Sequence, residues 1–354
     1  MGRFVRFASP RNVIVVAEED QEPTPSQVRI ATLFSGISAG TELSYYRGTN
    51  PHFGKSWDLD QRVFRPLGEG VGAASLSYPV DGKGQQEVGV VVEVGAEVDG
   101  VVPGDVVWGK WGHRSSAVKS ADYVRPRRLP AGANPVLGVF SQIGATALNI
   151  VLDADIHVGE TVAVFGLGVL GQITAQLARL NGADVIAVDP HDSRLKIAEA
   201  QGAAHTLNAN SGLIGERIHE LTGGRGVDVA LEVTGSYRAL HEAVRSASYS
   251  ARVVASGFFQ GEGAGLALGE EFHHNRIEIK CSQASGVSPQ LSYRWNDERL
   301  QRTVMDLAVS ERLRLEPLVT DVVPVERAAE AFDRLDRSRE RVLQSVLRFE
   351  EGGK

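Results

Sequence analysis

The amino-acid sequence predicts an α/β protein in which a β-rich segment precedes a doubly wound parallel sheet. Three observations lead to this prediction. Residues 160–189 read, in order, as an apolar strand, a glycine turn, a helix and a second strand. Strands and helices then alternate as far as residue 282. The stretch 13–34 instead alternates apolar and polar residues, as a strand with one solvated face does, around a polar loop or hairpin at 18–27.

The glycine turn is predicted to hold the pyrophosphate of a dinucleotide. A short apolar run, 161–165, leads into a stretch with the spacing G-x-G-x-x-G. The residues expected to contact the cofactor there are Gly166, Gly168, Val169, Leu170 and Gly171. The first glycine permits a tight turn, the second lets the backbone approach the phosphates, and the third lets the helix pack closely on the strand. The helix expected at 172–180 would begin near the second glycine and direct its free N–H groups at the anion.

An acidic residue ends the second strand of this motif. Asp189 stands 23 positions after Gly166, a distance that suits an acid accepting hydrogen bonds from two ribose hydroxyls. A carboxylate there repels a 2′-phosphate, so the sequence favours NAD(H) over NADP(H). Arg194, five residues further on, is a cation that works against this preference.

The strand and helix units that follow define the rest of the expected cofactor site. Strands are expected at 205–207, 227–233, 252–256 and, as the edge strand, 277–282, with helices at 193–201, 213–221 and 237–246. Ligands bind where the strands of such a sheet end. The residues expected at these ends, lining the cofactor cleft, are Thr234, Gly235, Ser256 and Gly257.

Composition excludes several classes of protein. A chain of 354 residues is long for a single core and favours two domains. The net charge of −7 offers no basic surface for nucleic acid. The single cysteine, Cys281, can form neither an internal disulfide nor a cysteine zinc cluster. No apolar run approaches the ~18 residues that span a bilayer, and residues 1–12 lack the apolar core of a signal peptide. A cytoplasmic protein is expected, without nucleic-acid or membrane partners.

One segment resembles a known family. Residues 36–48 read G-I-x-x-G-T-E-L-x-x-Y-R-G, which is similar to the opening of the medium-chain dehydrogenase/reductase superfamily, the alcohol dehydrogenase relatives. The resemblance implies a GroES-like β-rich catalytic domain made of residues 1–149 and 296–354, and a Rossmann nucleotide-binding domain at 150–295. It also implies a homodimer that pairs through the edge strand of the Rossmann sheet. An unpaired apolar edge would be a liability in a monomer.

The same resemblance implies that both zinc sites are missing. Zinc-dependent members carry G-I-C-G-T-D-L-H, and the metal-binding Cys corresponds here to Ser38 or, with the other alignment, to Ala39, with Ser44 in place of the His. The family's second ligand, a His in G-H-E-x-x-G, corresponds to Gln85; the weaker match at 68–72 has no His either.

The remaining landmarks of the family's metal sites agree with this interpretation. The third ligand falls in the neighbourhood of Ser141 or Gln142, and the four-cysteine lobe after residue 107 is absent. None of these residue types is a usual zinc ligand. The chain is therefore interpreted as a zinc-independent member.

Without a metal, a side chain must exchange the proton of the reaction. Three candidates follow. Thr41 occupies the place of the family's hydroxyl that contacts the substrate oxygen, and Tyr45 follows it. His113 has an ordinary pKa of ~6.5, which suits proton exchange near neutral pH; the alternative is a partly exposed loop histidine. Glu42 matches an acid that supports the family's zinc site, and without zinc it braces the turn.

A second polar group surrounds the expected edge strand. It contains His273, His274, Arg276, Arg294 and Trp295. Two interpretations remain open: binding of an anionic or polyhydroxylated substrate, or interface packing and solvated charge. Adjacent histidines on a strand point to opposite faces, so they are poor joint metal ligands.

The leading hypothesis for function is an NAD(H)-dependent, zinc-independent oxidoreductase that interconverts a secondary alcohol and a ketone. Sugar-like or cyclitol substrates fit the polar character of Thr41, Glu42, Gln85 and His113. A first alternative is an NAD(P)H-dependent quinone or enoyl reductase that reduces a carbon–carbon double bond. A second alternative is a protein that binds the nucleotide without redox chemistry.

Overall fold

The computed structural model describes residues 1–67, 75–283, 286–338 and 340–349. The chain forms two compact units. Unit 1 consists of Met1–Phe140 and Val319–Lys354, and unit 2 of Ser141–Leu318. The sequence placed the boundaries at 149/150 and 295/296 instead. They differ because helix α3 (Ser141–Asp153) packs against α4 (Val169–Leu180) and α8 (Asp297–Val309), so both flanking helices belong to unit 2.

Unit 2 is built on a parallel sheet of six described strands. Their order is β11-β10-β9-β12-β13-β14, and every neighbouring pair is parallel. The strands are β9 (Thr161–Phe165), β10 (Asp184–Asp189), β11 (His205–Asn208), β12 (Val227–Glu232), β13 (Ala247–Ala255) and β14 (Glu278–Cys281). In order of appearance this is 3-2-1-4-5-6, the dinucleotide-binding arrangement whose ligand crevice lies where the order reverses, between β9 and β12. The predicted doubly wound sheet is confirmed, with β14 at its edge.

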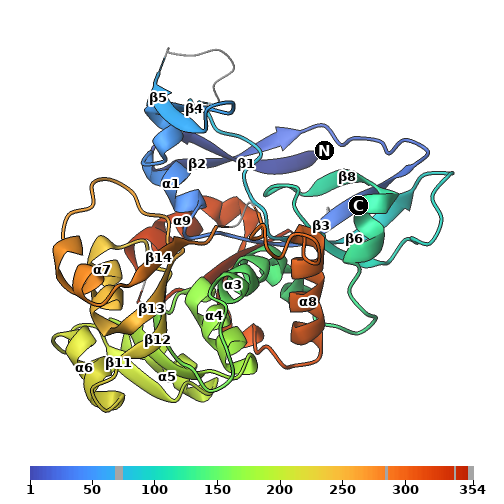
Figure 1. Cartoon of the computed structure of the whole chain (residues 1–354). Helices are drawn as coiled ribbons and strands as arrows, with labels where there is room; N and C mark the ends of the chain where they lie inside the picture. Colours follow the sequence, from blue (N-terminus) through green and yellow to red (C-terminus); the bar gives the residue numbers. More distant parts are fainter. Residues whose placement is uncertain (68–74, 284–285, 339, 350–354) are drawn as a thin grey trace. The chain divides into compact units, whose positions relative to one another are not determined.

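The helices of unit 2 connect these strands (Figure 1). The connecting helices are α4, α5 (Asp192–Ala200), α6 (Ile214–Leu221) and α7 (Tyr237–Ser246). Both α4 and α7 pack on the central strand β9. Because β9 crosses to β10 on one side and β12 crosses to β13 on the other, right-handed crossovers put these two helices on opposite faces. The central strands are therefore buried on both sides, which explains why they read as continuous apolar runs.

Unit 1 is mostly β-structure. Its larger sheet has the order β15-β16-β3-β6-β7, with β8 also paired to β3. These strands are β3 (Gln27–Gly36), β6 (Glu87–Val94), β7 (Val106–Gly109), β8 (Ser116–Ser120), β15 (Val319–Pro324) and β16 (Gln344–Arg348). Two hairpins accompany it: β1 (Gly2–Ser9) with β2 (Asn12–Glu18), and β4 (Lys55–Asp58) with β5 (Val63–Pro66). Within the polar stretch 18–27, residues 19–26 form a loop between two sheets, because β2 pairs with β1 while β3 pairs with β6.

The C-terminal part of the chain completes unit 1. Strand β16 pairs antiparallel with β3, which places Val346 opposite Gly36. Helix α9 (Ala328–Arg337) buries Phe332, whose ring lies 5.1 Å from that of Phe7 and 5.8 Å from that of Tyr46. Tyr46 comes from α1 (Glu42–Arg47), so this aromatic cluster holds the first helix of unit 1.

One apolar stretch is longer than the sequence analysis allowed. Residues Pro135–Asp153 are long and apolar enough to cross a membrane by length and composition, so the expectation that no such run exists was wrong. Of this stretch, 72% is buried inside the protein, as in the core helix of a globular protein.

Candidate functional site

The glycine turn after β9 accepts no larger residue at two of its positions. Gly166 has a φ of +96°, and a Cβ there would lie 2.4 Å from Cγ2 of Thr234. A Cβ on Gly171 would lie 1.7 Å from the carbonyl oxygen of Gly166. The first glycine is therefore needed for the turn, and the third for the close approach of α4 to β9.

The middle glycine of the turn faces open space. A Cβ on Gly168 would meet no atom within 4 Å. Gly168 is the N-cap of α4, no side chain caps this helix, and Val169 and Leu170 in its first turn are partly exposed. The helix thus presents uncapped N–H groups and its positive dipole end to an accessible space, which fits the pyrophosphate of a dinucleotide.

Asp189 lies at the end of β10, beside this turn. Its side chain is 2% exposed; Oδ2 accepts a hydrogen bond from the N–H of Leu167 (2.7 Å), and Oδ1 accepts one from the N–H of His191 (2.9 Å). The guanidinium of Arg194 lies 3.4 Å from Oδ2. The predicted acid is therefore bonded to the turn itself, and the predicted cation forms an ion pair with it.

The loops after β12 and β13 complete the cofactor site. Thr234 contacts the glycine turn, as described above, and Gly235 has a φ of +74°. A Cβ on Gly257 would lie 1.9 Å from the Gly235 nitrogen, so these two loops touch. The hydroxyl of Ser256 is buried and has no hydrogen-bond partner among the described residues. All the residues predicted to bind the cofactor thus gather around the ends of β9, β10, β12 and β13.

Sequence reasoning missed Glu232, which organises these loops. It ends β12, is fully buried, and accepts hydrogen bonds from the N–H of Thr234 (2.7 Å), the N–H of Gly235 (3.2 Å) and the Thr234 hydroxyl. Burial raises the pKa of Glu232, against the effect of these hydrogen bonds. The position of an acidic residue at the end of an apolar strand could have identified Glu232 from the sequence. The buried hydroxyl of Ser282, which follows β14, likewise has no hydrogen-bond partner within the part of the chain that the structure describes.

In unit 1, two predicted catalytic residues lie on or next to α1. Thr41 is the N-cap of this helix, is partly exposed, and makes no capping hydrogen bond through its side chain. Tyr45 lies one turn later and is half-buried; burial raises its pKa, and the charge of Glu42 adds to this effect. The ammonium of Lys83 lies 5.0 Å from the centre of the Tyr45 ring.

The third candidate, His113, lies in a buried hydrogen-bond network. Its side chain is fully buried, with Nε2 2.6 Å from Oε2 of Glu42 and Nδ1 2.6 Å from the hydroxyl of Ser35. The Ser35 hydroxyl donates to Glu87 (3.0 Å), whose other oxygen accepts the N–H of Trp111 (2.7 Å). His113 is thus neither a partly exposed loop residue nor open to solvent. Any effect of its proton on a substrate must pass through Glu42 or Ser35.

The network favours a positively charged His113. When Glu87 is ionised, the single proton of the Ser35 hydroxyl is donated to it, so Ser35 accepts from Nδ1–H of His113, while Nε2–H donates to Glu42. Burial opposes the charge on His113, but the charge and hydrogen bond of Glu42, together with Glu87, outweigh burial and raise its pKa. Burial also raises the pKa of Glu87, despite the opposing charge of His113. Glu42 additionally accepts the N–H of Ser38 (3.0 Å), so it braces the turn before α1 as expected.

The positions that the family uses for zinc carry hydroxyl, methyl and amide groups here. Ser38 is buried, Ser44 donates to the carbonyl oxygen of Thr41 (2.6 Å), and Gln142 accepts a hydrogen bond from Gln301 (2.8 Å). The alternative match at 68–72 lies outside the described residues. Among the residues that the structure describes, no group of three or more His, Cys, Asp or Glu side chains could hold a metal. This donor set does not fit zinc.

The polar group around the edge strand does not form one site. The rings of His273 and His274 lie 5.4 Å apart, and both residues are exposed. The guanidinium of Arg294 stacks on the Tyr293 ring, and the guanidinium of Arg299 lies 4.3 Å from the centre of the Trp295 ring. No hydrogen bond or ring contact between described residues joins the two stretches. Arg276, also exposed, has a φ of +51° in the turn that leads into β14.

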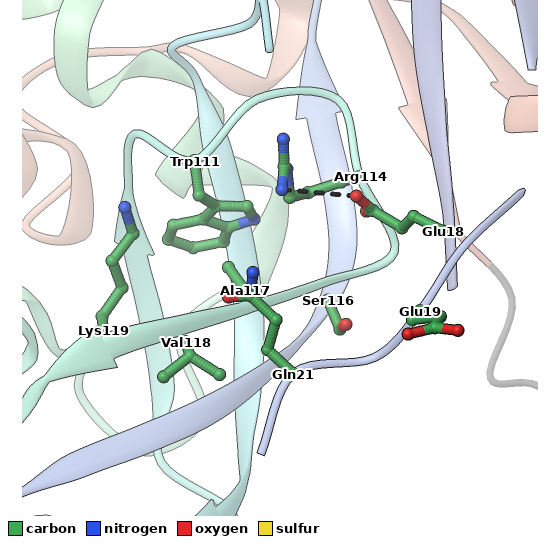
Figure 2. A pocket seen from close by; sticks show the side chains of 9 residues that line it. All are labelled: Glu18, Glu19, Gln21, Trp111, Arg114, Ser116, Ala117, Val118 and Lys119. Carbon is green, nitrogen blue, oxygen red and sulfur yellow. Dashed lines mark hydrogen bonds and ion pairs between the residues drawn. The ribbon is translucent and has the colours of Figure 1, made fainter. Parts of the chain in front are cut away.

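A cavity of about 280 Å³ in unit 1 is lined by other residues (Figure 2). Trp111 and Lys119 lie on one side, and Arg114 pairs with Glu18 at 3.4 Å on the other. None of the predicted catalytic or cofactor-binding residues lines it. We therefore do not place the reaction there.

Comparison with known proteins agrees with this fold. Residues 169–296 match the family model for zinc-binding dehydrogenases. The chain is 31% identical to D-guloside 3-dehydrogenase of Escherichia coli (strain K12), over 92% of this chain and 93% of that protein. It is 27% identical to (R,R)-butanediol dehydrogenase of Bacillus subtilis (strain 168), over 80% and 84%. The crystal structure of 2R,3R-butanediol dehydrogenase from Bacillus subtilis superposes with a TM-score of 0.77 at 22% identity, covering 98% and 99% of the two chains. The chain therefore belongs to the medium-chain dehydrogenase/reductase superfamily.

Proposed function

We propose that the protein is an NAD(H)-dependent, zinc-independent oxidoreductase that interconverts a secondary alcohol of a sugar-like or cyclitol substrate and the corresponding ketone. The observation that carries the proposal is the glycine turn, which leaves the N-terminus of α4 uncapped and binds Asp189 to its own backbone. The sugar-like substrate is supported by the similarity to D-guloside 3-dehydrogenase along most of both chains.

The preference for NAD(H) depends on Asp189. Its two oxygens each accept one backbone N–H and keep further lone pairs for ribose hydroxyls. Arg194 is held 3.4 Å from the same carboxylate, so its charge is partly neutralised before any 2′-phosphate could use it. Both features favour a ribose with a free 2′-hydroxyl.

The residues of unit 1 would handle the substrate oxygen. When bound, NAD⁺ would accept the hydride of the alcohol carbon. The Thr41 hydroxyl is partly exposed and is not used as a helix cap, so it can bond to that oxygen. A tyrosine phenol is protonated near neutral pH, and burial raises the pKa of Tyr45 further, so its hydroxyl acts as a hydrogen-bond donor.

The buried network has a supporting role in this proposal. His113 connects α1, through Glu42, to the strand that begins at Glu87, through Ser35. In a zinc-dependent relative a metal would connect the corresponding segments. We propose that the charged hydrogen bonds of His113 keep them together here.

The proposal is tested by measuring metal content, nucleotide binding and turnover on the same preparation. Protein purified without added metal is titrated with NADH and NADPH, followed by nucleotide fluorescence, and then assayed with NAD⁺ and a panel of glycosides, sugars, cyclitols and simple secondary alcohols. We expect tighter binding of NADH, and turnover of polyhydroxylated substrates with less than stoichiometric metal. Stoichiometric zinc would contradict the zinc-independent part, and tight NADH binding without any turnover would favour a non-redox role. Preferential NADPH binding with reduction of enones would favour the reductase alternative.

We also propose a homodimer formed through β14. Of the described strands, β14 pairs only with β13, so its other edge has backbone groups available. Its side chains are half-buried or exposed within one chain. Light scattering coupled to gel filtration is expected to give twice the chain mass; a single chain mass at micromolar concentration would contradict the proposal.

A further inference from the structure

We propose that the ammonium of Lys83 supplies the positive charge that a catalytic zinc supplies in metal-dependent relatives, by contacting the substrate oxygen where negative charge develops. This inference depends on the alcohol–ketone reaction proposed above. Oxidation converts the alcohol and NAD⁺ into ketone, NADH and a proton, which leaves the hydroxyl group for water. The oxygen carries its largest negative charge between loss of the proton and loss of the hydride, and a cation is needed there when no metal is present.

Lys83 lies where such a cation is required. It precedes Gln85, the residue at the position of the family's second metal ligand, by two positions. Its Nζ lies 5.0 Å from the centre of the Tyr45 ring, and Tyr45 is one helical turn from Thr41. Lys83 thus lies beside Tyr45, one of the two side chains proposed to contact the substrate oxygen, on the helix that begins after the other, Thr41.

The charge of Lys83 is available to a ligand. The side chain is half-buried, and among the described residues it forms no ion pair with a carboxylate. Several arginines of unit 1 are neutralised in this way: Arg6 pairs with Asp81, and Arg11 and Arg47 both pair with Asp336. An aromatic ring is a weaker partner than a carboxylate, so Lys83 keeps most of its charge for an anionic oxygen.

The buried network fixes both Lys83 and Tyr45 in place. The carbonyl oxygen of Lys83 accepts the backbone N–H of His113 (3.0 Å). Gly84 follows with a φ of +116°, and a Cβ on it would lie 2.7 Å from the same His113 nitrogen. The His113 ring in turn bonds to Glu42 on α1, the helix of Tyr45. His113 therefore positions both Lys83 and helix α1, whose Tyr45 ring Lys83 faces. Electrostatic catalysis needs charges that are held in place in this way.

The test compares Lys83→Met with a matched control, Lys119→Met. Lys119 is also a lysine of unit 1 held over a tyrosine, 5.4 Å from the Tyr123 ring, but it lines the cavity of Figure 2. On metal-free enzyme with the best substrate of the panel, we expect Lys83→Met to lower kcat by roughly 10²–10³-fold, as loss of one oxyanion donor does. KM should change far less, Lys83→Arg should retain part of the activity, and Lys119→Met should match the wild type. NADH affinity and the melting temperature should be unchanged in all variants.

A chemical rescue separates a catalytic from a structural role. Ethylammonium added to Lys83→Ala should restore part of kcat, with saturation, and should leave Lys119→Ala unaffected. A wild-type kcat in Lys83→Met, or a loss of kcat that follows the melting temperature and is not rescued, would overturn the role of Lys83 while leaving the dehydrogenase proposal intact. Absence of turnover by the wild type with every alcohol and ketone would overturn both.

Discussion

The buried pair of Glu42 and His113 gives the sharpest prediction about stability. In Glu42→Gln the shape is retained but the charge is removed, so a desolvated imidazolium keeps only the indirect support of Glu87 through Ser35. Removing one partner of a buried pair typically costs about 3–5 kcal/mol. For a unit of this size, each kcal/mol lowers the melting temperature by roughly 2–4 °C, so a decrease of roughly 6–20 °C is expected.

Tryptophan fluorescence is a suitable probe for this experiment. Three of the four tryptophans, Trp57, Trp108 and Trp111, belong to unit 1, and Trp111 bonds directly to the network. The matched control is Glu326→Gln, which breaks the pair with Arg3 on the surface, where the Glu326 side chain is 51% exposed. Surface pairs contribute little, so the control should melt close to the wild type. If Glu42→Gln melts at a temperature no lower than Glu326→Gln does, the Glu42–His113 pair does not stabilise unit 1 as described.

The contacts of Asp189, Gly171 and His113 can each be tested by substitution. Asp189→Ala should shift the ratio of NADH to NADPH affinity towards NADPH, because the substitution removes the ribose acceptor and the ion-pair partner of Arg194. Fluorescence titrations with both nucleotides measure this ratio, and an unchanged ratio would count against the contact assigned to Asp189. Gly171→Ala should abolish NADH binding, since its Cβ would lie 1.7 Å from a carbonyl oxygen, whereas Gly269→Ala, with nothing within 4 Å, should bind normally. The folded-state pKa of His113 is raised, so its stabilisation is complete below its unfolded value of ~6.5 and is lost as pH rises through the folded value. The melting temperature of unit 1 should therefore fall with rising pH in the wild type and less so in His113→Gln; equal slopes would contradict this.

The nucleotide-binding sheet was predictable because its signals are local. The central strands of unit 2 are short apolar runs. The spacing from Gly166 to Asp189 reflects the distance between the glycine turn and the end of the next strand. The unit boundaries were harder to predict, because α3 joins unit 2 through packing against α4 and against α8, and α8 lies far from it in sequence. The spacing of apolar residues within α3 shows that one face of the helix is buried, but it does not show which other helices cover that face.

The site in unit 1 could be predicted only in part. Thr41 and Tyr45 remain predictions made from the motif around them, whereas the motif gave no indication of the partners of His113, because Glu42 and His113 are 71 positions apart. Only the topology of the sheet brings them together. Glu87 gave a weak signal, a lone acid at the start of an apolar strand, and Lys83 gave none, because a lysine in a glycine-rich loop is usually a solvated charge.

The central claim is that this chain performs hydride chemistry with NAD(H) and without a metal. The most direct measurement is the rate of NADH formation from NAD⁺ and a polyhydroxylated secondary alcohol, with the metal content of the same sample determined by mass spectrometry. We expect turnover that persists after dialysis against a strong chelator and does not increase on addition of Zn²⁺. Turnover that disappears with the chelator and returns in proportion to added Zn²⁺ would contradict it.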